Sequence, residues 1–427
     1  MSSMVLAQVL MVATLVLMVS GLTPLYTTAI LGSAIAALAA GFPLAGGDPI
    51  TIAKMINGGL NPVIADMTGV LLFIGVMQSA GFLDVIIKAL IRVGRKMGGG
   101  PGVAAAGGLA AGVIGALTGF TQPVITGAIT GPAAVKLGVD PNKAAGITGH
   151  AGHFGNFAGF THPSQVALIA AAGIGFGLIN IAGAIVSLTI FTVSYIRLQR
   201  SMKASGTYLT PEQMEAIAAE YERNDRGIST FTAFAPFIIL VAGFVLGFPV
   251  FLVGLVAGVS TIFLGKISPK QGETWMLEGV GKIATPIVAT IGFLFMSATI
   301  KNVGLVELIG QVMSPALDVS PLLVMWAVAA LTGLLTQSYA ASGAVLLPIL
   351  QVVINAGADP LAAVIAAGGG ASTMQYFLTG GPVAALATVI PVVPGSDLRT
   401  ANKFQRPSIF CGTLMALVLC LAFTILF

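Results

Sequence analysis

The sequence contains one apolar stretch twice, in two slightly different versions. The first version is PVIADMTGVLLFIGVMQSAG at residues 62–81, and the second is PIVATIGFLFMSATIKNVG at residues 286–304. Three further matches follow in the same order: LTGFTQPVITGAITGP (117–132) with LTGLLTQSYAASGAVLLP (331–348), GVDPNKAA (138–145) with GADPLAAV (357–364), and Pro163 with Pro382. Self-similarity of this kind indicates a duplication. We therefore expect two copies of one module, residues 1–200 and 228–427, joined by a linker at 201–227.

The composition places both copies in a lipid bilayer. Only 8 % of the 427 residues are charged and 56 % are hydrophobic, with a mean hydropathy of +0.99, whereas about a quarter of a soluble protein is charged. Backbone groups must be hydrogen-bonded within the hydrocarbon, so apolar segments of about 20 residues are expected to be helices. The net charge of +4 is too small and too dispersed for a nucleic-acid partner. The sequence predicts an all-α polytopic membrane protein.

Ten apolar segments are long enough to be spans. They are 4–22, 25–42, 62–80, 144–172, 178–196, 230–247, 249–266, 284–301, 361–390 and 408–427. Two more apolar segments, 102–135 and 321–356, are interrupted near their middle. Their short arms favour re-entrant hairpins, although two complete spans would also return the chain to its starting side. The pieces 81–99 and 302–318 are expected to be short connecting helices near the interface.

Basic residues indicate how the two copies are oriented. If the interrupted segments enter and leave on one side, seventeen of the nineteen Lys and Arg residues face the cytoplasm, and only Lys54 and Lys301 face outward. The positive-inside rule favours this topology. It makes the two copies inverted repeats in an inner (plasma) membrane, with the linker region 197–229 in the cytoplasm.

Interruptions at matched places in inverted repeats are typical of secondary transporters, whose ligand sites lie where broken helices meet. Half-helix N-termini offer N–H groups to an anion. The alternative is that Gly and Pro are simply common in membrane helices and that the hydroxyl groups bond to their own backbone. We expect substrate contacts from the hairpins 102–135 and 321–356 and from the broken helices 144–172 and 361–390. The candidates are Thr121, Gln122, Thr336, Gln337 and Ser338 in the hairpins, and Asn156, Thr161, Ser372, Thr373 and Gln375 in the broken helices.

Ionisable side chains within the spans are candidates for ion coupling. All three histidines, His150, His153 and His162, lie at one interruption, and Asp66 is the only acidic residue inside a predicted span. Intramembrane ionisable groups usually mark a pathway or a relay, and histidine titrates near neutral pH. The histidines could couple protons or bind a carboxylate, pack as hydrogen-bonded groups, or bind a metal, although no carboxylate or Cys lies nearby. Asp66 could couple a cation or serve as a capping or surface residue.

Two matched Asp-Pro pairs, Asp140-Pro141 and Asp359-Pro360, are predicted to begin helices. Aspartate is a favoured N-cap, and proline is favoured at the first helical position.

The predicted core contains no Lys or Arg, so an anionic ligand would be neutralised by helix ends, by protonated His or by a co-transported cation. This favours small carboxylates coupled to H⁺ or Na⁺. No phosphate-binding loop of the Gly-x-x-x-x-Gly-Lys-Ser/Thr type is present, so we expect no ATP hydrolysis, no enzyme activity and no cofactor.

The layout resembles the ion transporter superfamily, which includes gluconate, lactate, C4-dicarboxylate and citrate carriers. The resemblance rests on the hairpins with Thr121-Gln122 and Thr336-Gln337 and on the interruptions at 149–163 and 368–382. It implies inverted repeats, a substrate held between hairpin tips and unwound helices, elevator-type movement and often a homodimer. The superfamily's sodium-dicarboxylate Ser-Asn-Thr motif is absent from both hairpins, and the three histidines favour protons.

These observations predict a symporter of a small organic anion, with the lipid bilayer and a second copy of the chain as its other partners. Two alternatives remain open. One is a cation/proton antiporter that depends on Asp66, and the other is the membrane subunit of a multi-component uptake system.

Overall fold

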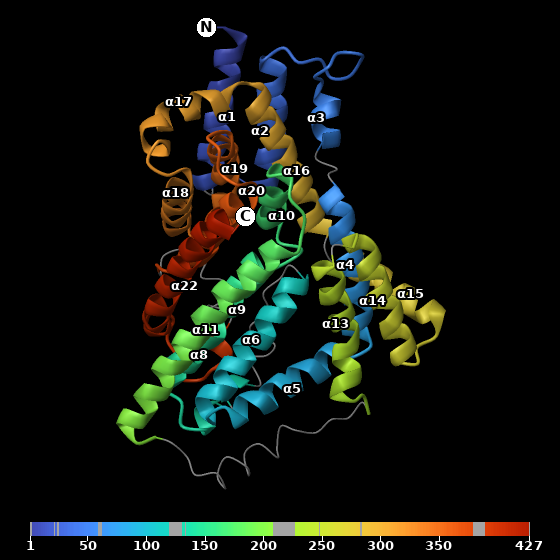
Figure 1. Ribbon diagram of the computed structural model, residues 1–427, viewed down its shortest axis with the longest axis vertical. Helices are drawn as coiled ribbons and strands as arrows, with labels where there is room; N and C mark the ends of the chain where they lie inside the picture. The colour runs from blue at the N-terminus through green and yellow to red at the C-terminus, as the bar shows by residue number, and fades with distance from the viewer. Residues whose placement is uncertain are drawn as a thin grey trace.

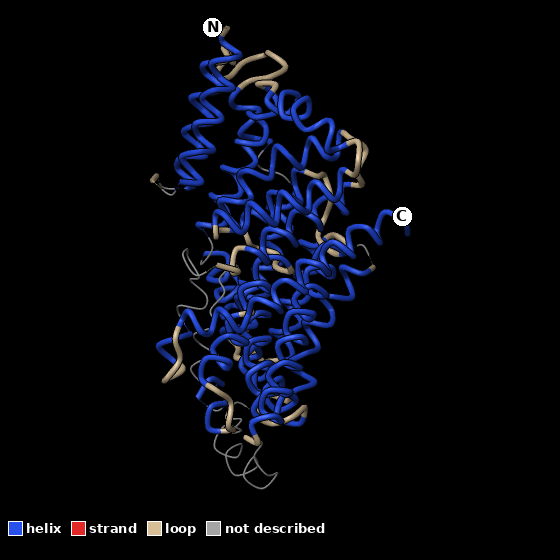
Figure 2. The backbone as a smooth tube through the Cα atoms, turned by 90° about the vertical axis from the view of Figure 1, so that its left-hand side faces the viewer, coloured by secondary structure: helices blue, strands red, loops and turns tan. Residues whose placement is uncertain are grey.

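The computed structural model describes residues 2–20, 22–23, 25–58, 62–118, 130–132, 134–207, 227–246, 248–281, 284–378 and 389–426. Within these ranges the chain forms α-helices, loops and one short 3₁₀ helix, and it forms no strand. Figure 2 shows helices throughout the length of the molecule. The protein is an all-α polytopic membrane protein, as its composition predicts.

The helices of the first copy follow one another over residues 3–205 (Figure 1). They are α1 (Ser3–Ser20), α2 (Leu25–Ala39), α3 (Ile52–Gly58), α4 (Pro62–Ser79), α5 (Phe82–Lys96), α6 (Gly100–Thr118), α8 (Pro141–Gly149), α9 (Ala151–Phe157), α10 (Pro163–Ala171) and α11 (Leu178–Ser205).

The helices of the second copy begin at residue 230. They are α13 (Thr230–Val245), α14 (Val250–Leu264), α15 (Pro269–Gly281), α16 (Ala284–Asn302), α17 (Leu305–Leu317), α18 (Pro321–Thr336), α19 (Tyr339–Asn355), α20 (Pro360–Met374), the 3₁₀ helix η1 (Ile390–Val392) and α22 (Leu398–Leu426).

Three of the described helices, α1, α11 and α22, are long and apolar enough to cross a bilayer unaided. The bent pair α16–α17 would add a fourth span if it is counted as one. Most other predicted spans are apolar helices of fewer than 18 residues in the described part of the chain.

The repeated stretches 62–81 and 286–304 both end in a bend at a glycine with left-handed backbone conformation. Gly81 separates α4 from α5 with a φ of +79°, and Gly304 separates α16 from α17 with a φ of +71°. A residue with a side chain rarely adopts this left-handed conformation, so glycine suits both positions. The second bend is 75°. The residues that match in sequence thus make the same turn in space.

Helix packing is reciprocal between the copies. Helix α4 contacts α14 and α15 of the other copy, and its counterpart α16 contacts α2 and α3 of the first copy. Similarly, α6 contacts α8 and α9, while its counterpart α18 contacts α20. The connecting helices α5 and α17 lie at opposite ends of the molecule (Figure 1). This exchange makes the two copies one interlocked body.

The interruptions occur where the sequence places them, as far as they are described. Helix α18 ends at Thr336 and α19 begins at Tyr339, and α9 ends at Phe157 while α10 begins at Pro163. Helix α20 ends at Met374, close to the second predicted break. The first hairpin tip (119–129), the end of the second broken helix (379–388) and most of the linker (208–226) lie outside the described residues.

Both Asp-Pro pairs begin helices, which confirms the capping prediction. The Asp140 side chain accepts a hydrogen bond from the Lys143 backbone N–H, and Asp359 accepts one from the Ala362 backbone N–H. Proline follows each cap at the first helical position. The broken helix of each copy therefore begins with an Asp N-cap followed by Pro.

Several helix boundaries differ from the sequence prediction, and two α-helices, α3 and α15, are additional. Helix α22 begins ten residues before the predicted span at 408–427, and α11 continues to Ser205. Both extensions carry basic residues, which lower hydropathy but do not prevent a helix outside the hydrocarbon. Helix α15 was not predicted, because Lys270, Glu273 and Glu278 mask it in a hydropathy scan.

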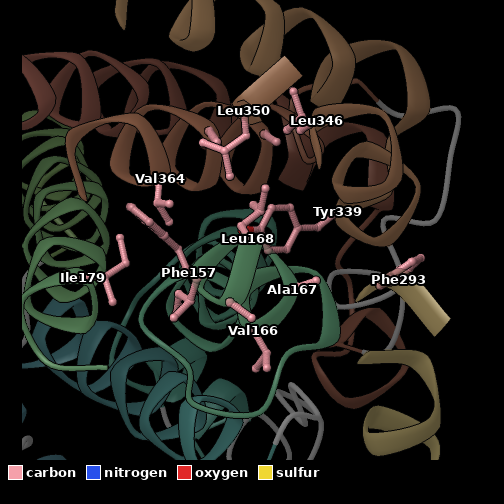
Figure 3. Packing of buried hydrophobic residues seen from close by; sticks show 14 of the residues in the cluster. Phe157, Val166, Ala167, Leu168, Ile179, Phe293, Tyr339, Leu346, Leu350 and Val364 are labelled. Atoms are coloured by element: carbon pink, nitrogen blue, oxygen red, sulfur yellow. The ribbon is translucent and has the colours of Figure 1, made fainter. Parts of the chain in front are cut away.

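The apolar core surrounds α10, the short helix after the first break. Val166, Ala167 and Leu168 of α10 are fully buried against residues of both copies. Figure 3 shows them among Phe157, Ile179, Tyr339, Leu346, Leu350 and Val364. The first turn of α10 is therefore held rigidly in the middle of the molecule.

Candidate functional site

Buried polar atoms without a hydrogen-bond partner are concentrated at the breaks. Eleven such side-chain atoms occur in the described part of the chain, and eight belong to the first broken helix, to α20 or to the α18–α19 turn. Buried polar groups are nearly always hydrogen-bonded, so each exception requires an explanation such as a bound water, ion or ligand. The eight belong to His150, His153, Thr161, His162, Ser164, Gln165, Gln337 and Ser372.

The N-terminus of α10 carries four of these unpartnered atoms. His162 is the N-cap residue, with extended backbone and no side-chain capping bond, and Pro163 follows it. The unpartnered atoms are Thr161 Oγ1, His162 Nδ1, Ser164 Oγ and Gln165 Nε2. A helix N-terminus attracts negative charge through its free N–H groups and its dipole. Hydroxyl and amide donors around it strengthen that preference.

A second helix N-terminus, that of α19, packs against the first. The His162 and Tyr339 rings have centroids 4.8 Å apart, and the Tyr339 hydroxyl donates a hydrogen bond to Gln165 Oε1. A Cβ atom at Gly343 would lie 2.5 Å from Ser164 Cβ, so the two first turns touch. Ser338 caps α19 by accepting from the Ala341 N–H. The first turns of α10 and α19 thus form one polar region within the core.

The tip of the second hairpin completes this region. Gln337 has a φ of +50°, and its buried Oε1 has no partner. The Thr336 hydroxyl is bonded to the Ser342 hydroxyl at 2.8 Å and to the Ser338 carbonyl at 3.1 Å, so it stabilises the turn itself. Of the three predicted hairpin residues that the structure describes, Thr336, Gln337 and Ser338, Gln337 is the one with an unpartnered side-chain atom.

Gln375 joins the hairpin to the second broken helix. Its Oε1 accepts a hydrogen bond from the Tyr339 backbone N–H at 2.8 Å, and its Nε2 donates to the Ser372 carbonyl at 3.0 Å. The Ser372 hydroxyl is buried without a partner. Ser372 and Gln375, both predicted from the sequence, therefore connect α19 to α20.

His150, His153 and Asn156 form a second polar group beside α20. His153 Nδ1 lies 3.3 Å from the Ser372 carbonyl oxygen, and its ring contacts the Tyr376 ring edge-on with centroids 4.5 Å apart. Asn156 Nδ2 donates to the Tyr376 hydroxyl at 3.0 Å. The His150 and His153 rings are 5.5 Å apart. The spacing of three residues places these side chains on one face, as expected from the sequence.

Thr373, another predicted contact residue, has its hydroxyl group in the packing between α20 and α22. Its hydroxyl donates to the Gly369 carbonyl at 2.7 Å and is bonded to the Thr413 hydroxyl of α22 at 2.7 Å. This placement favours helix packing over ligand contact. Thr121 and Gln122 lie outside the described residues, and Asp66 lies in α4, with its side chain outside what the structure describes.

Several residues of the site were not predicted from the sequence. They are Ser164, Gln165, Ser194, Tyr339, Tyr376 and Ser408. Ser164 and Gln165 directly follow Pro163, and a search for polar residues in the first turn after a break would have found them. Ser194 and Ser408 lie in long helices, where nothing local distinguishes them from ordinary packing residues.

The segments that form the site contain no charged residue besides the titratable histidines. Residues 144–196, 319–358 and 360–396 contain no Asp, Glu, Lys or Arg. An isolated anion in such an environment is costly unless hydrogen bonds or an opposite charge compensate it. The first turns of α10 and α19 supply the hydrogen bonds, and a protonated histidine would supply the charge.

Two solved structures share the fold of this chain. The Alcanivorax borkumensis YdaH transporter aligns with 97 % of this chain and 97 % of its own, with a TM-score of 0.61 and 16 % identity. Neisseria gonorrhoeae MtrF, described among antimetabolite efflux pumps, aligns with 97 % of this chain and 94 % of its own, with a TM-score of 0.59 and 14 % identity. No protein-family model and no curated protein sequence matches the chain. At these identities the likeness concerns the fold of polytopic transporters.

Proposed function

We propose that this protein is a secondary active symporter of a small organic anion, a carboxylate coupled to H⁺ or Na⁺, in the inner (plasma) membrane. The supporting observation is the pair of helix N-termini, α10 and α19, that meet in the core with unpartnered donors around them. A carboxylate accepts several hydrogen bonds at once, which matches hydroxyl and amide donors at a helix N-terminus.

We assign ligand contacts to residues whose buried side-chain atoms have no hydrogen-bond partner. Thr161, Ser164 and Gln165 supply donors from the first broken helix, and Gln337 and Ser372 lie beside them from the hairpin and from α20. Thr121 and Gln122 complete the site in the first hairpin if the two copies are symmetric. His150, His153 and His162 carry the coupling charge.

An inverted arrangement and an elevator-type movement belong to the same proposal. Reciprocal packing of α4 and α16, and the opposite placement of α5 and α17 (Figure 1), support inverted repeats with the linker in the cytoplasm. The resemblance to the ion transporter superfamily adds the expectation of a homodimer in which the hairpins and broken helices move against the remaining helices.

Ligand-induced stabilisation tests the proposal. The purified protein is heated with lactate, gluconate, succinate or citrate, each with and without Na⁺ at pH 5.5 and pH 7.5. A ligand at about 100 times its Kd stabilises the folded state by about 2.7 kcal/mol, which raises the melting temperature. Lower pH should strengthen the effect if protons couple, and Na⁺ should strengthen it if sodium does.

A matched variant separates specific binding from a general salt effect. Ser164→Ala removes an unpartnered hydroxyl at the α10 N-terminus and should reduce the ligand-induced shift. Ser205→Ala, at the exposed end of α11, should leave it intact. If no acid stabilises the protein under any condition, or if both variants respond equally, the organic-anion proposal is wrong.

A further inference from the structure

The tautomers of two buried histidines follow from their hydrogen bonds. His153 Nδ1 faces the Ser372 carbonyl oxygen, which can only accept, so Nδ1 carries the hydrogen. His150 Nε2 lies 2.6 Å from Ser194 Oγ. Because the Ser194 hydroxyl hydrogen is donated to Ser408 Oγ, also at 2.6 Å, Ser194 accepts from His150 Nε2–H. The second nitrogen of each neutral ring is therefore a bare acceptor.

Both bare nitrogens are buried and unpartnered. They are His150 Nδ1 and His153 Nε2, on rings whose centroids are 5.5 Å apart and whose exposed fractions are 0 % and 1 %. Two buried acceptors without a donor are unfavourable. One added proton turns one of these nitrogens into a donor, and at this ring separation a single water molecule can link it to the other ring. One additional proton would therefore give both acceptor nitrogens a hydrogen-bonding role.

We infer that His150 and His153 together hold the coupled proton, and that the anion site around His162 is separate from this proton site. This inference rests on the proposed symport function and deepens it, because it selects H⁺ as the coupling ion and divides the three histidines between two sites.

A continuous set of contacts connects the two sites. The Ser372 carbonyl that accepts from His153 also accepts from Gln375 Nε2 at 3.0 Å. Gln375 Oε1 in turn accepts from the Tyr339 N–H at the start of α19, and the Tyr339 ring packs on His162. The hairpin tip is thus linked to His153 through the Gln375 side chain and the Ser372 carbonyl.

The charges around the pair explain why proton and anion would bind together. Arg197 of α11 acts electrostatically on His150, and α22 contributes Arg399, Lys403 and Arg406 further along its polar end. Among the other described elements packed here, α6 and α20 carry no charged residue, and α8 carries Lys143 and begins at the Asp140 cap. With the Arg197 guanidinium as the charge that acts on His150, a proton on the buried pair is costly until an anion binds nearby.

Nitrogen NMR tests the tautomers without any ligand. The chain has only three histidines, so ¹⁵N-ring labelling in nanodiscs gives three ring systems that single substitutions assign. The expected result is Nε2–H for His150 and Nδ1–H for His153, with both rings changing in one shared protonation step as pH falls. Opposite tautomers, or two independent titrations, would overturn the inference.

Two variants keep the donated hydrogen bond and replace the basic ring nitrogen by an amide group that takes up no proton. His150→Gln retains an amide donor toward Ser194, and His153→Asn retains one toward Ser372. In proteoliposomes, the measured ratio of protons to succinate should fall at least tenfold in each variant relative to the wild type, because the shared proton site is lost. An unchanged ratio in both variants would refute the proton assignment.

The NMR measurement and the transport measurement distinguish a failure of this inference from a failure of the proposed function. If the wild type moves none of the four acids of the thermal screen, the symport proposal fails, and the NMR result still decides whether the histidine pair shares a proton. If succinate is not the substrate, the ratio is measured with whichever of the other three acids is transported. Size-exclusion profiles of both variants check that they are folded.

Discussion

Single threonines show the difference between a ligand-binding hydroxyl and a packing hydroxyl. Thr161 and Thr373 are both fully buried and both lie beside the breaks. Thr161 Oγ1 has no partner, whereas the Thr373 hydroxyl is bonded to Gly369 and Thr413. The sequence predicted both as ligand contacts, because it shows residue type and position in the chain but not which hydroxyl already has partners.

Replacing each threonine by valine should separate these roles. Thr161→Val removes an unpartnered hydroxyl, so the melting temperature should hold or rise. The ligand loses a hydrogen bond of about 1 kcal/mol, which weakens affinity roughly five- to tenfold.

Thr373→Val should behave in the opposite way. It removes the hydrogen bond between Thr373 and Thr413, although Thr413 keeps its bond to the Ile409 carbonyl, and should lower the stability by about 1 kcal/mol. Ligand affinity should stay within about twofold. Isothermal titration and thermal unfolding of both variants measure the contrast, and a Thr161→Val protein with full affinity would remove Thr161 from the site.

At the level of helices, close packing through glycine joins the two copies. A Cβ atom added to Gly279 of α15 would lie 2.5 Å from both Gly75 Cα and Leu71 O of α4. These neighbours are backbone atoms of the other copy, so they cannot move aside as a side chain could. Glycine makes this contact possible, as is common between membrane helices.

An alanine pair on α15 tests this contact. Gly279→Ala should destabilise the protein by about 1–3 kcal/mol through overpacking. Gly281→Ala lies two residues away on the same helix, where an added Cβ meets nothing within 4 Å, and should be neutral or stabilising by less than about 1 kcal/mol. Equal melting temperatures for the two variants would show that α4 and α15 are not closely packed.

The helices also show what hydropathy can and cannot predict. The breaks at Gln337-Ser338 and 158–162 and the caps at Asp140 and Asp359 are local features, and the sequence predicted them. Helix α15 and the early start of α22 escaped prediction because charges outside the hydrocarbon lower hydropathy without breaking a helix.

For the whole molecule, the left-handed bends at Gly81 and Gly304 and the reciprocal packing of α4 and α16 agree with the predicted duplication, which stays a prediction. The links from His150 to Ser194 and from Gln165 to Tyr339 were not predicted. These pairs are separated by 44 and 174 positions, and sequence periodicity contains no information about contacts between distant helices.

The central claim is that the two copies are inverted around one polar site, and cysteine labelling tests it most directly. In a Cys411→Ala/Cys420→Ala background, Met97→Cys reports the end of α5 and Val319→Cys reports the end of α17; both side chains are exposed. A membrane-impermeant maleimide should label Val319→Cys in intact spheroplasts and Met97→Cys only after permeabilisation. Labelling of both cysteines from the same side would contradict inverted repeats.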